Sequence, residues 1–593
     1  MGLMDILTAC SLEINATAVT ITCLVTFLVL LYWYSTFSYS RLQNVGIRHP
    51  PPLPFIGNLL YFRKGFWEGH NKLINKYGPA CGYYIGRRMF IVISEPDMIK
   101  FILTEDFQNF TNRMTVDLAS KPLADSILIL RDERWKGVRG VLTPAFSTAR
   151  IKEMAPLINQ ACDILLSNLK VYADSGRAFD IQRNYSCFTL DIVVSMAFGI
   201  QLDSFKNSND TFVKNSKIFF EPAFSRPLLI LTIAFPFIMI PLLRILPNKK
   251  REEVNRFFID TVKNTIALRD QQDPNERRRD FLQLMLDARS SDNDVTVEHF
   301  DFINQADFDV KTSETAANQS LPKKQQKRLS EDEIAGQASL FLIAGYETTN
   351  SILSFATYVL ATNPSCQEKL LQETDEFFFK HDFPDYKNIH ELPYLDMVIA
   401  ETLRMYPPAF RFTREAAKDC LVLKQHIPAG AVVEVAVGHL HYNPKIWPEP
   451  HKFIPERFTT EAKQQRNPFS YLPFGAGPRS CIGLKLALME VKITLLRILQ
   501  KFKFQTCPET QVCTSAVFFK PHFPVYRVAM ERDYLKIAFD SNFDSDRSVQ
   551  EFILWLNHSH FNIKRGRHLH FCFLARGFHA FQLFEHIFPN YHG

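Results

Sequence analysis

The stretch Phe474-Gly475-Ala476-Gly477-Pro478-Arg479-Ser480-Cys481-Ile482-Gly483 places one cysteine at the end of a glycine-rich loop, directly before a helical pattern. A cysteine thiolate can be the axial ligand of a haem iron and donate electron density to it. The glycines give the backbone freedom and permit close approach, so that peptide N–H groups can point at the sulfur. Arg479 is placed to donate charge-assisted hydrogen bonds to a haem propionate. We therefore predict that Cys481 is the ligand of the haem iron and that Phe474, Gly475, Arg479 and Gly483 help to bind the cofactor.

A second motif, Glu401-Thr402-Leu403-Arg404, places a carboxylate and a guanidinium three residues apart on one face of a predicted helix. Alone, this spacing describes a surface ion pair. Pro455-Glu456-Arg457-Phe458 follows it at the interval typical of the cytochrome P-450 superfamily, which this chain resembles. The resemblance implies that Glu401, Arg404 and Arg457 form the superfamily's structural triad, which ties the helix to the loop before the ligand.

Further residues of the cofactor site follow from the same resemblance. Trp135 and Arg139 lie four residues apart on one helical face and match a pair of propionate donors of the superfamily. Arg414 is expected to bind the cofactor as well. The cofactor implied is haem b, with Cys481 as the only protein ligand of the metal.

A long apolar stretch from Ile334 to Thr362 is opened by Ser330-Glu331-Asp332-Glu333, a capping box, and closed by Asn363-Pro364. Gln337, Glu347 and Asn350 inside the stretch favour a helix buried in a globular core over a membrane span. Its centre resembles the distal helix of the superfamily. The resemblance implies that small residues make room above the iron and that an acid–alcohol pair can relay protons to bound dioxygen. The expected catalytic residues here are Ala344, Gly345, Glu347 and Thr348.

Composition and length fit one large catalytic domain in the 593-residue chain. The resemblance implies the cytochrome P-450 fold, a mixed and mainly α domain with small β-sheets, over residues 49–512, and a monomer. A hydrophobic content of 46% provides an ample core, and a net charge of +6 is too small to indicate nucleic acid as a partner. The eleven cysteines form no C-x-x-C pair, which favours a reducing, cytosolic environment.

The N-terminal 1–48 segment is predicted to anchor the chain in a membrane. No charged residue occurs between Ile14 and Ser40, and the apolar run of about 20 residues can cross a bilayer. Arg41 and Arg48 follow it, which favours a cytosolic catalytic domain. The resemblance to microsomal members implies a single-pass protein of the endoplasmic reticulum membrane. A second uncharged run, between Arg226 and Arg244, is interrupted by prolines, and we predict an apolar surface that dips into membrane lipid rather than a second span.

Two segments depart from a compact domain. Residues 305–328 are polar and lysine-bearing, and we predict a solvated insertion before the distal helix. Residues 513–593 are rich in Phe and His and match nothing in the family, so we treat them as an atypical tail. The pairs His558/His560 and His568/His570 in it lack the ordered spacing of a metal site.

Longer strings point to one branch of the superfamily. The chain from about residue 30 to Val512, notably Tyr83–Lys100, Ile266–Gln272 and Arg404–Ala417, resembles the thromboxane synthase family. The resemblance implies that the substrate is prostaglandin H2, a fatty-acid endoperoxide. The implied reaction is isomerisation to thromboxane A2, with fragmentation to hydroxy-heptadecatrienoic acid and malondialdehyde, without NADPH or a reductase.

Two departures keep other functions open. A bulky apolar residue often stands in that branch at the position of Thr348, whereas the Glu-Thr-Thr of this chain is typical of monooxygenases. The alternative is therefore a microsomal monooxygenase of drugs, steroids or fatty acids that depends on NADPH and its reductase. The tail replaces the family's final strands, which leaves a haem-binding but inactive variant as a third possibility.

Overall fold

The computed structural model describes residues 16–114, 119–206, 211–220, 226–246, 248–273, 277, 280–290, 329–508, 510 and 527–531. Helices dominate these residues and the strands are short, which confirms the predicted mixed, mainly α class. The helices are α2 (Ala16–Thr36), α3 (Ser40–Asn44), α4 (Phe66–Tyr77), α5 (Pro96–Lys100), α6 (Asp132–Leu142), α7 (Thr148–Ser175), α8 (Ile181–Phe198), α9 (Thr211–Phe220), α10 (Arg226–Ala234), α11 (Pro236–Ile245), α12 (Lys249–Asp270), α13 (Phe281–Ser290), α14 (Glu331–Thr362), α15 (Pro364–Lys380), α16 (Pro393–Met405), α17 (Val437–His441), α18 (Thr460–Gln464) and α19 (Leu484–Leu499).

The largest sheet has the strand order β1 (Ala80–Ile85), β2 (Arg88–Ile93), β7 (Val432–Val435) and β4 (Phe412–Glu415). β1 and β2 form an antiparallel hairpin whose two-residue turn begins with Gly86 at φ 57°. Glycine suits this position because a positive φ costs it little. β7 runs parallel to β2 and antiparallel to β4, and β2 and β7 are buried almost throughout. The smaller sheets are β3 (Phe179–Asp180), β9 (Arg527–Glu531) and β8 (Lys503–Thr506), and the pair β5 (Cys420–Val422) and β6 (Gln425–Ile427).

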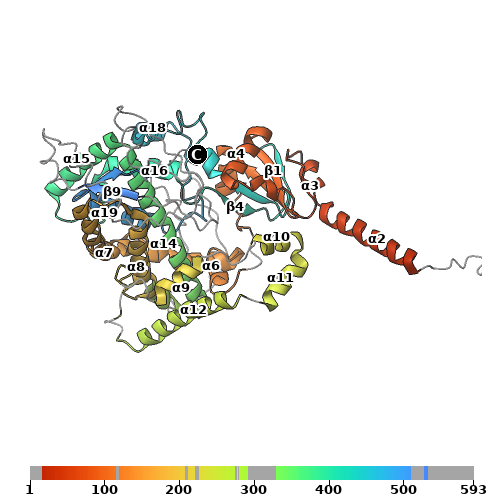
Figure 1. The fold of residues 1–593 in the computed structure, drawn as a ribbon, viewed down its shortest axis with the longest axis horizontal. Coiled ribbons are helices and arrows are strands. Elements are labelled where there is room, and N and C mark those ends of the chain that lie inside the picture. The colour runs from red at the N-terminus through yellow and green to blue at the C-terminus, as the bar shows by residue number, and fades with distance from the viewer. Residues whose placement is uncertain are drawn as a thin grey trace, which may run out of the picture. The chain divides into compact units, whose positions relative to one another are not determined.

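The predicted buried helix is α14, which runs through the helical part of the fold beside α8 (Figure 1). It begins with the predicted capping box, because the Ser330 side chain accepts from the N–H of Glu333 and the Glu333 carboxylate accepts from the N–H of Ser330. Its inner amide Asn350 is satisfied by α8, because it donates to the Ser186 hydroxyl (2.9 Å). These contacts explain how an apolar helix of 32 residues can carry amides inside a protein core.

The N-terminal helix α2 has the features of a membrane anchor. It carries no charge, and Thr17–Thr36 is long and apolar enough to cross a membrane, with none of its apolar window buried. Among the described residues it is the one helix that meets this test. The second apolar run forms α10 and α11, of 9 and 10 residues, which separate at Phe235. Each is too short to span a bilayer. Their exposed apolar side chains are Leu229, Ile230, Leu231, Phe237, Ile238, Leu242 and Ile245.

The two atypical segments fall mostly outside the described residues. The predicted insertion at 305–328 lies outside them, as do the histidine pairs near the C-terminus. From the segment predicted as a tail, β9 is described, and it pairs antiparallel with β8 and β3. This segment therefore contributes a strand to the same sheet as residues 503–506.

Candidate functional site

Cys481 lies just before α19, in a loop fixed by its own backbone. Its N–H donates to the carbonyl of Phe474 (3.0 Å). The Cys481 thiol is accessible from the cavity that it lines but lies deep in the protein, and desolvation there raises its pKa. The N–H groups of Gly483 and Leu484 that donate to the sulfur, and the cations Arg139 and Arg113, act in the opposite direction. A thiol ionises when it coordinates a metal, and donated N–H groups then stabilise the thiolate and tune the metal. The loop thus offers a preformed thiolate site.

The three glycines of the loop differ in their roles. Gly475 and Gly477 both have φ 72°, in the left-handed region. A Cβ on Gly477 would lie 2.0 Å from the carbonyl oxygen of Leu103, whereas one on Gly483 would meet nothing closer than 3.9 Å. The close approach that we predicted for these glycines therefore occurs at Gly477, and Gly483 has an ordinary φ of −88°.

We expect Gly477→Ala to displace the ligand loop and to lower the haem content of the purified protein severalfold. The control is Gly430→Ala, because Gly430 has φ 73° and its Cβ would meet nothing within 4 Å. Both variants bear the left-handed penalty of roughly 1–2 kcal/mol, but only Gly477→Ala adds a clash with backbone. Haem per polypeptide is the measurement, and equal haem content in the two variants would contradict this account of the loop.

A cavity of about 320 Å³ is lined by Cys481 and by α14. Ala344, Gly345 and Thr348 line it from α14. A Cβ on Gly345 would lie 2.6 Å from Val193 Cγ2, so this glycine also allows α8 to pack closely on α14. Phe474, Gly475, Gly483, Arg414 and Arg479 line the cavity as well. Apolar side chains make up much of the rest: Ile127, Phe146, Val193, Met196, Phe281, Leu340, Phe341, Ile352, Leu403, Phe412, Ile482 and Leu486.

Arginines gather at this cavity. Arg113, Arg414 and Arg479 line it, and Arg139 is buried nearby, next to the thiol. Burial and the neighbouring guanidinium groups lower the pKa of Arg479 to about 8 and that of Arg414 to about 9, and burial lowers that of Arg139 to about 10. Among the residues that the structure describes, none of the four forms an ion pair with a carboxylate.

The arginine cluster fits a dianionic cofactor. Nε of Arg113 and Nε of Arg414 are buried and find no hydrogen-bond partner in the described part of the chain. Buried cations without anions are costly, so the site favours a ligand that brings its own negative charges. The two propionates of a haem are such charges. The soft sulfur therefore suits the haem iron, and the arginine cluster at the same apolar cavity suits the propionates.

Trp135, which we predicted with Arg139 as a pair of propionate donors, lies against the Arg479 guanidinium. The Arg479 guanidinium donates to the carbonyls of Thr111 (2.8 Å), Ile127 (3.2 Å) and Leu130 (3.0 Å) and lies 4.1 Å from the ring centroid of Trp135. Trp135 is buried on α6 and does not line the cavity. It therefore supports the Arg479 guanidinium by a cation–π contact.

Of the predicted acid–alcohol pair, one member lies at the cavity wall. Thr348 lines the cavity, and its hydroxyl donates to the carbonyl of Ala344 (2.5 Å). Glu347 is half-buried, burial raises its pKa, and it does not line the cavity.

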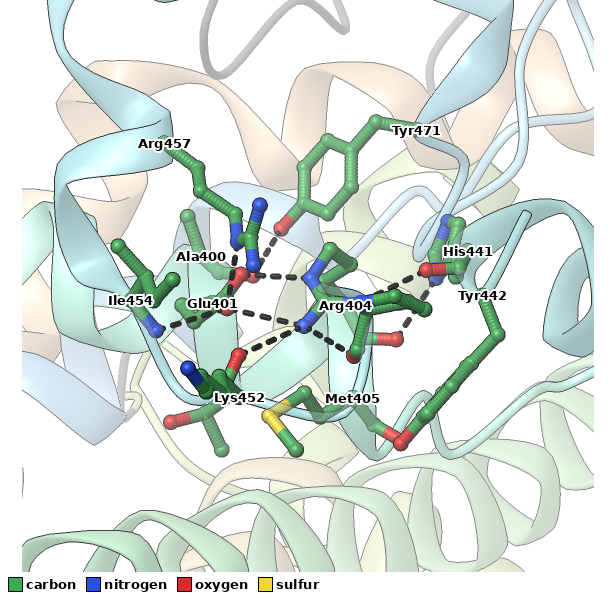
Figure 2. A network of polar contacts seen from close by, with 12 residues as sticks. Ala400, Glu401, Arg404, Met405, His441, Tyr442, Lys452, Ile454, Arg457 and Tyr471 are labelled. Atoms are coloured by element: carbon green, nitrogen blue, oxygen red, sulfur yellow. Dashed lines mark hydrogen bonds and ion pairs between the residues drawn. The ribbon is translucent and has the colours of Figure 1, made fainter. Parts of the chain in front are cut away.

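The predicted triad residues are in contact, as Figure 2 shows. Arg404 donates to both Glu401 oxygens, through Nε (2.6 Å) and Nη2 (2.9 Å), and Arg457 Nε donates to Glu401 Oε1 (3.3 Å). Glu401 and Arg404 have no solvent exposure. The other bonds fix loops: Arg404 donates to the carbonyls of His441, Pro450 and Lys452, and the Ile454 N–H donates to Glu401.

His441 extends this network to the ligand loop, and sequence reasoning missed it. Its Nε2 accepts from the N–H of Leu472 (2.9 Å), so its Nδ1 carries the proton and donates to the carbonyl of Arg404 (3.1 Å). Burial and the Arg404 charge lower the pKa of His441 to about 3, which keeps the ring neutral. The histidine thus joins α16 to the backbone nine residues before Cys481. No spacing in the sequence signals this contact.

Two further residues that line the cavity were not predicted from the sequence. Arg113 is one of the cationic groups described above, but it stands in a loop without a recognisable spacing to Cys481. Glu490 on α19 is buried, and burial raises its pKa to about 8. It stands nine residues after Cys481 in a part of α19 that is buried from Met489 to Leu499, so its spacing gave no signal.

Comparisons with known proteins agree with this geometry. The sequence model of the family "Cytochrome P450" matches residues 47–307 and 303–518. The chain is 59% identical over 510 residues to "Thromboxane-A synthase" of Macaca fascicularis, which is 86% of this chain and 96% of that protein. It is 58% identical over 511 residues to the protein of that name in Sus scrofa, with the same coverage.

A more distant relative comes from another branch. The chain is 38% identical over 518 residues to "Cytochrome P450 3A29" of Sus scrofa, which is 86% of this chain and 96% of that protein. The matched residues include the cysteine loop, the buried triad and the distal helix described above. This chain belongs to the cytochrome P450 family.

Proposed function

We propose that the protein is a haem-thiolate isomerase that converts prostaglandin H2 to thromboxane A2, and by fragmentation to hydroxy-heptadecatrienoic acid and malondialdehyde. The observation that carries the proposal is the identity of 56–59% to four proteins named thromboxane-A synthase, each matched over 96% of its length. The cytochrome P450 3A relatives reach 36–38%. The difference favours the isomerase branch.

The residues at the cavity have the following roles in this proposal. Cys481 would hold the iron of haem b through its sulfur, and the N–H groups of Gly483 and Leu484 would stabilise the thiolate. Arg113, Arg139, Arg414 and Arg479 neutralise the propionates. A thiolate-ligated haem supplies an electron-rich iron that can exchange single electrons with a peroxide. The triad of Glu401, Arg404 and Arg457 holds the ligand loop in place rather than taking part in the chemistry.

The apolar wall is suited to a fatty-acid endoperoxide. Phe146, Phe281, Leu340 and Ile352 give the cavity a surface that excludes water and orients a flexible chain. An isomerisation leaves the composition and the oxidation level of the substrate unchanged, so it requires neither NADPH nor a reductase nor dioxygen. The hydroxyl of Thr348 donates its hydrogen bond to the carbonyl of Ala344. In an isomerisation it has no proton to deliver to the substrate.

The remaining assignments complete the proposal. Residues 1–48 form the anchor of a single-pass protein in the endoplasmic reticulum membrane, and residues 49–512 form a cytosolic, monomeric catalytic domain. The exposed apolar side chains of α10 and α11 support contact of this domain with membrane lipid, from which a lipid substrate enters.

Thr348 also favours a second candidate, the monooxygenase, because it places a hydroxyl at the cavity. If the protein is an isomerase, Thr348→Val should leave prostaglandin H2 turnover within a few-fold of wild type, since no proton is delivered in the reaction. A monooxygenase should lose coupling by about 10²–10⁴-fold. Turnover of both proteins is measured with and without NADPH and reductase.

Two outcomes count against the isomerase. Wild-type turnover that demands NADPH, with a large loss in Thr348→Val, would assign the protein to the monooxygenases. A normal thiolate–haem spectrum without turnover under either condition would indicate the inactive variant.

A further inference from the structure

One segment that lines the cavity is held in part by a buried amide of α14. We call residues 119–131 the roof segment. Its residue Ile127 lines the cavity and is buried. The Gln337 side chain has no solvent exposure: its Oε1 accepts from the N–H of Ile127 (2.9 Å), and its Nε2 donates to the carbonyls of Asp125 (2.8 Å) and Glu333 (3.1 Å). Since the roof presents one backbone donor and one acceptor, this amide orientation satisfies both.

The neighbouring Gly336 supports the same contact from the backbone side. A Cβ there would lie 2.8 Å from the carbonyl oxygen of Pro122 and 2.9 Å from the carbonyl carbon of Asp125. The roof segment therefore rests directly on α14 over one turn of that helix. A side chain at 336 would push it away.

The other side of the roof is held by Arg479. This arginine donates to the carbonyls of Ile127 and Leu130. The backbone of Ile127 is consequently fixed on both sides: Gln337 binds its N–H and Arg479 binds its carbonyl. Gln337, Phe341, Ala344 and Thr348 also share one face of α14, because they are spaced by three or four residues. Gln337, which holds the roof segment, and Ala344 and Thr348, which line the cavity, thus belong to the same rigid helix.

We propose that Gln337 is a positioning residue that fixes the roof segment over the cavity and thereby determines how the substrate chain is oriented. The inference rests on the proposed function, in which the substrate is a fatty-acid endoperoxide that can either isomerise or fragment. Orientation of the chain above the reacting oxygens decides between these outcomes. A loosened roof should therefore change the ratio of products as well as affinity.

The test compares Gln337→Leu with a matched variant, Gln367→Leu. Gln367 is equally buried and holds a backbone in the same way: its Nε2 donates to the carbonyl of Phe504 (2.9 Å) and its Oε1 accepts from the N–H of Phe504 (2.7 Å). It does not line the cavity. Both substitutions remove an amide of similar burial, so general destabilisation should be comparable and only the location differs.

Three readouts are taken on the haem-loaded proteins. Hydrogen exchange of peptides covering 119–131 should rise on the order of tenfold in Gln337→Leu and remain unchanged in Gln367→Leu, because two hydrogen bonds to the roof are lost. Affinity for an unreactive analogue, in which carbon replaces one peroxide oxygen, should fall about fivefold or more, measured by the shift of the haem absorption band. The ratio of isomer to fragmentation products should shift towards fragmentation in Gln337→Leu alone.

Gly336→Ala provides a second variant that keeps the amide and displaces the roof sterically. It should reproduce the exchange, affinity and product changes. The inference is overturned if exchange rises in 119–131 while affinity and product ratio stay at wild-type values, or if Gln367→Leu shifts the ratio equally. If the wild type does not turn over prostaglandin H2, the proposed function has failed, whereas exchange and analogue binding still decide the role of Gln337.

Discussion

Cys481→Ala is expected to abolish the red-shifted absorption band that thiolate ligation gives to the reduced carbon-monoxide complex of haem. Turnover should fall to background, because alanine offers the iron no ligand and no neighbouring soft anion can replace the thiolate. The spectrum of the purified variant, reconstituted with haem, is the measurement. This is the largest single effect that the site predicts.

The control for this variant is Cys162→Ala. Cys162 is a buried thiol on α7 whose sulfur lies 3.9 Å from the hydroxyl of Thr494, away from the cavity. Its loss should leave the band intact, with at most a moderate loss of stability. If Cys481→Ala retained the band, Cys481 would not be the iron ligand, and the assignment of the cavity as the haem site would fall with it.

Glu401→Ala should yield little haem-containing protein. Removal of the carboxylate leaves the Arg404 guanidinium buried, with no solvent exposure, and without its counter-charge. The cost of breaking a buried pair in this way is on the order of 3–5 kcal/mol, a large part of the stability of a typical domain. The yield of folded, haem-loaded protein and its thermal midpoint measure the effect.

A neighbouring carboxylate gives the matched control. Glu456 precedes Arg457 and pairs with Lys369 (2.7 Å), but both side chains are exposed. Exposed ion pairs contribute little, so Glu456→Ala should retain wild-type yield and midpoint. Normal haem content in Glu401→Ala, or equal losses in both variants, would contradict the structural role proposed for the triad.

Features encoded within a few residues could be predicted from the sequence. The capping box of Ser330 and Glu333 and the contact of Glu401 with Arg404 each depend on a spacing of three residues along one helix. The end of α14 at Asn363-Pro364 and the break between α10 and α11 follow from proline chemistry in the same way. Local steric and hydrogen-bond rules suffice for such features.

Contacts between distant segments could not be predicted in this manner. Gln337 meets a backbone 210 residues earlier in the chain, and His441 meets Leu472 through a loop without periodicity. Arg113 reaches the cavity from a loop with no characteristic pattern. Of Glu347 and Thr348, which are adjacent in the sequence, the structure places only Thr348 at the cavity. These features depend on how whole elements pack.

The most direct test of the central claim offers prostaglandin H2 to purified, haem-loaded protein in the absence of reductase and NADPH. We expect thromboxane A2, detected as its stable hydrolysis product, together with hydroxy-heptadecatrienoic acid and malondialdehyde, at a rate that added NADPH and reductase leave unchanged. Cys481→Ala, assayed in parallel, should form none of them above background. Consumption of substrate only when NADPH and reductase are present, with hydroxylated products, would contradict the account.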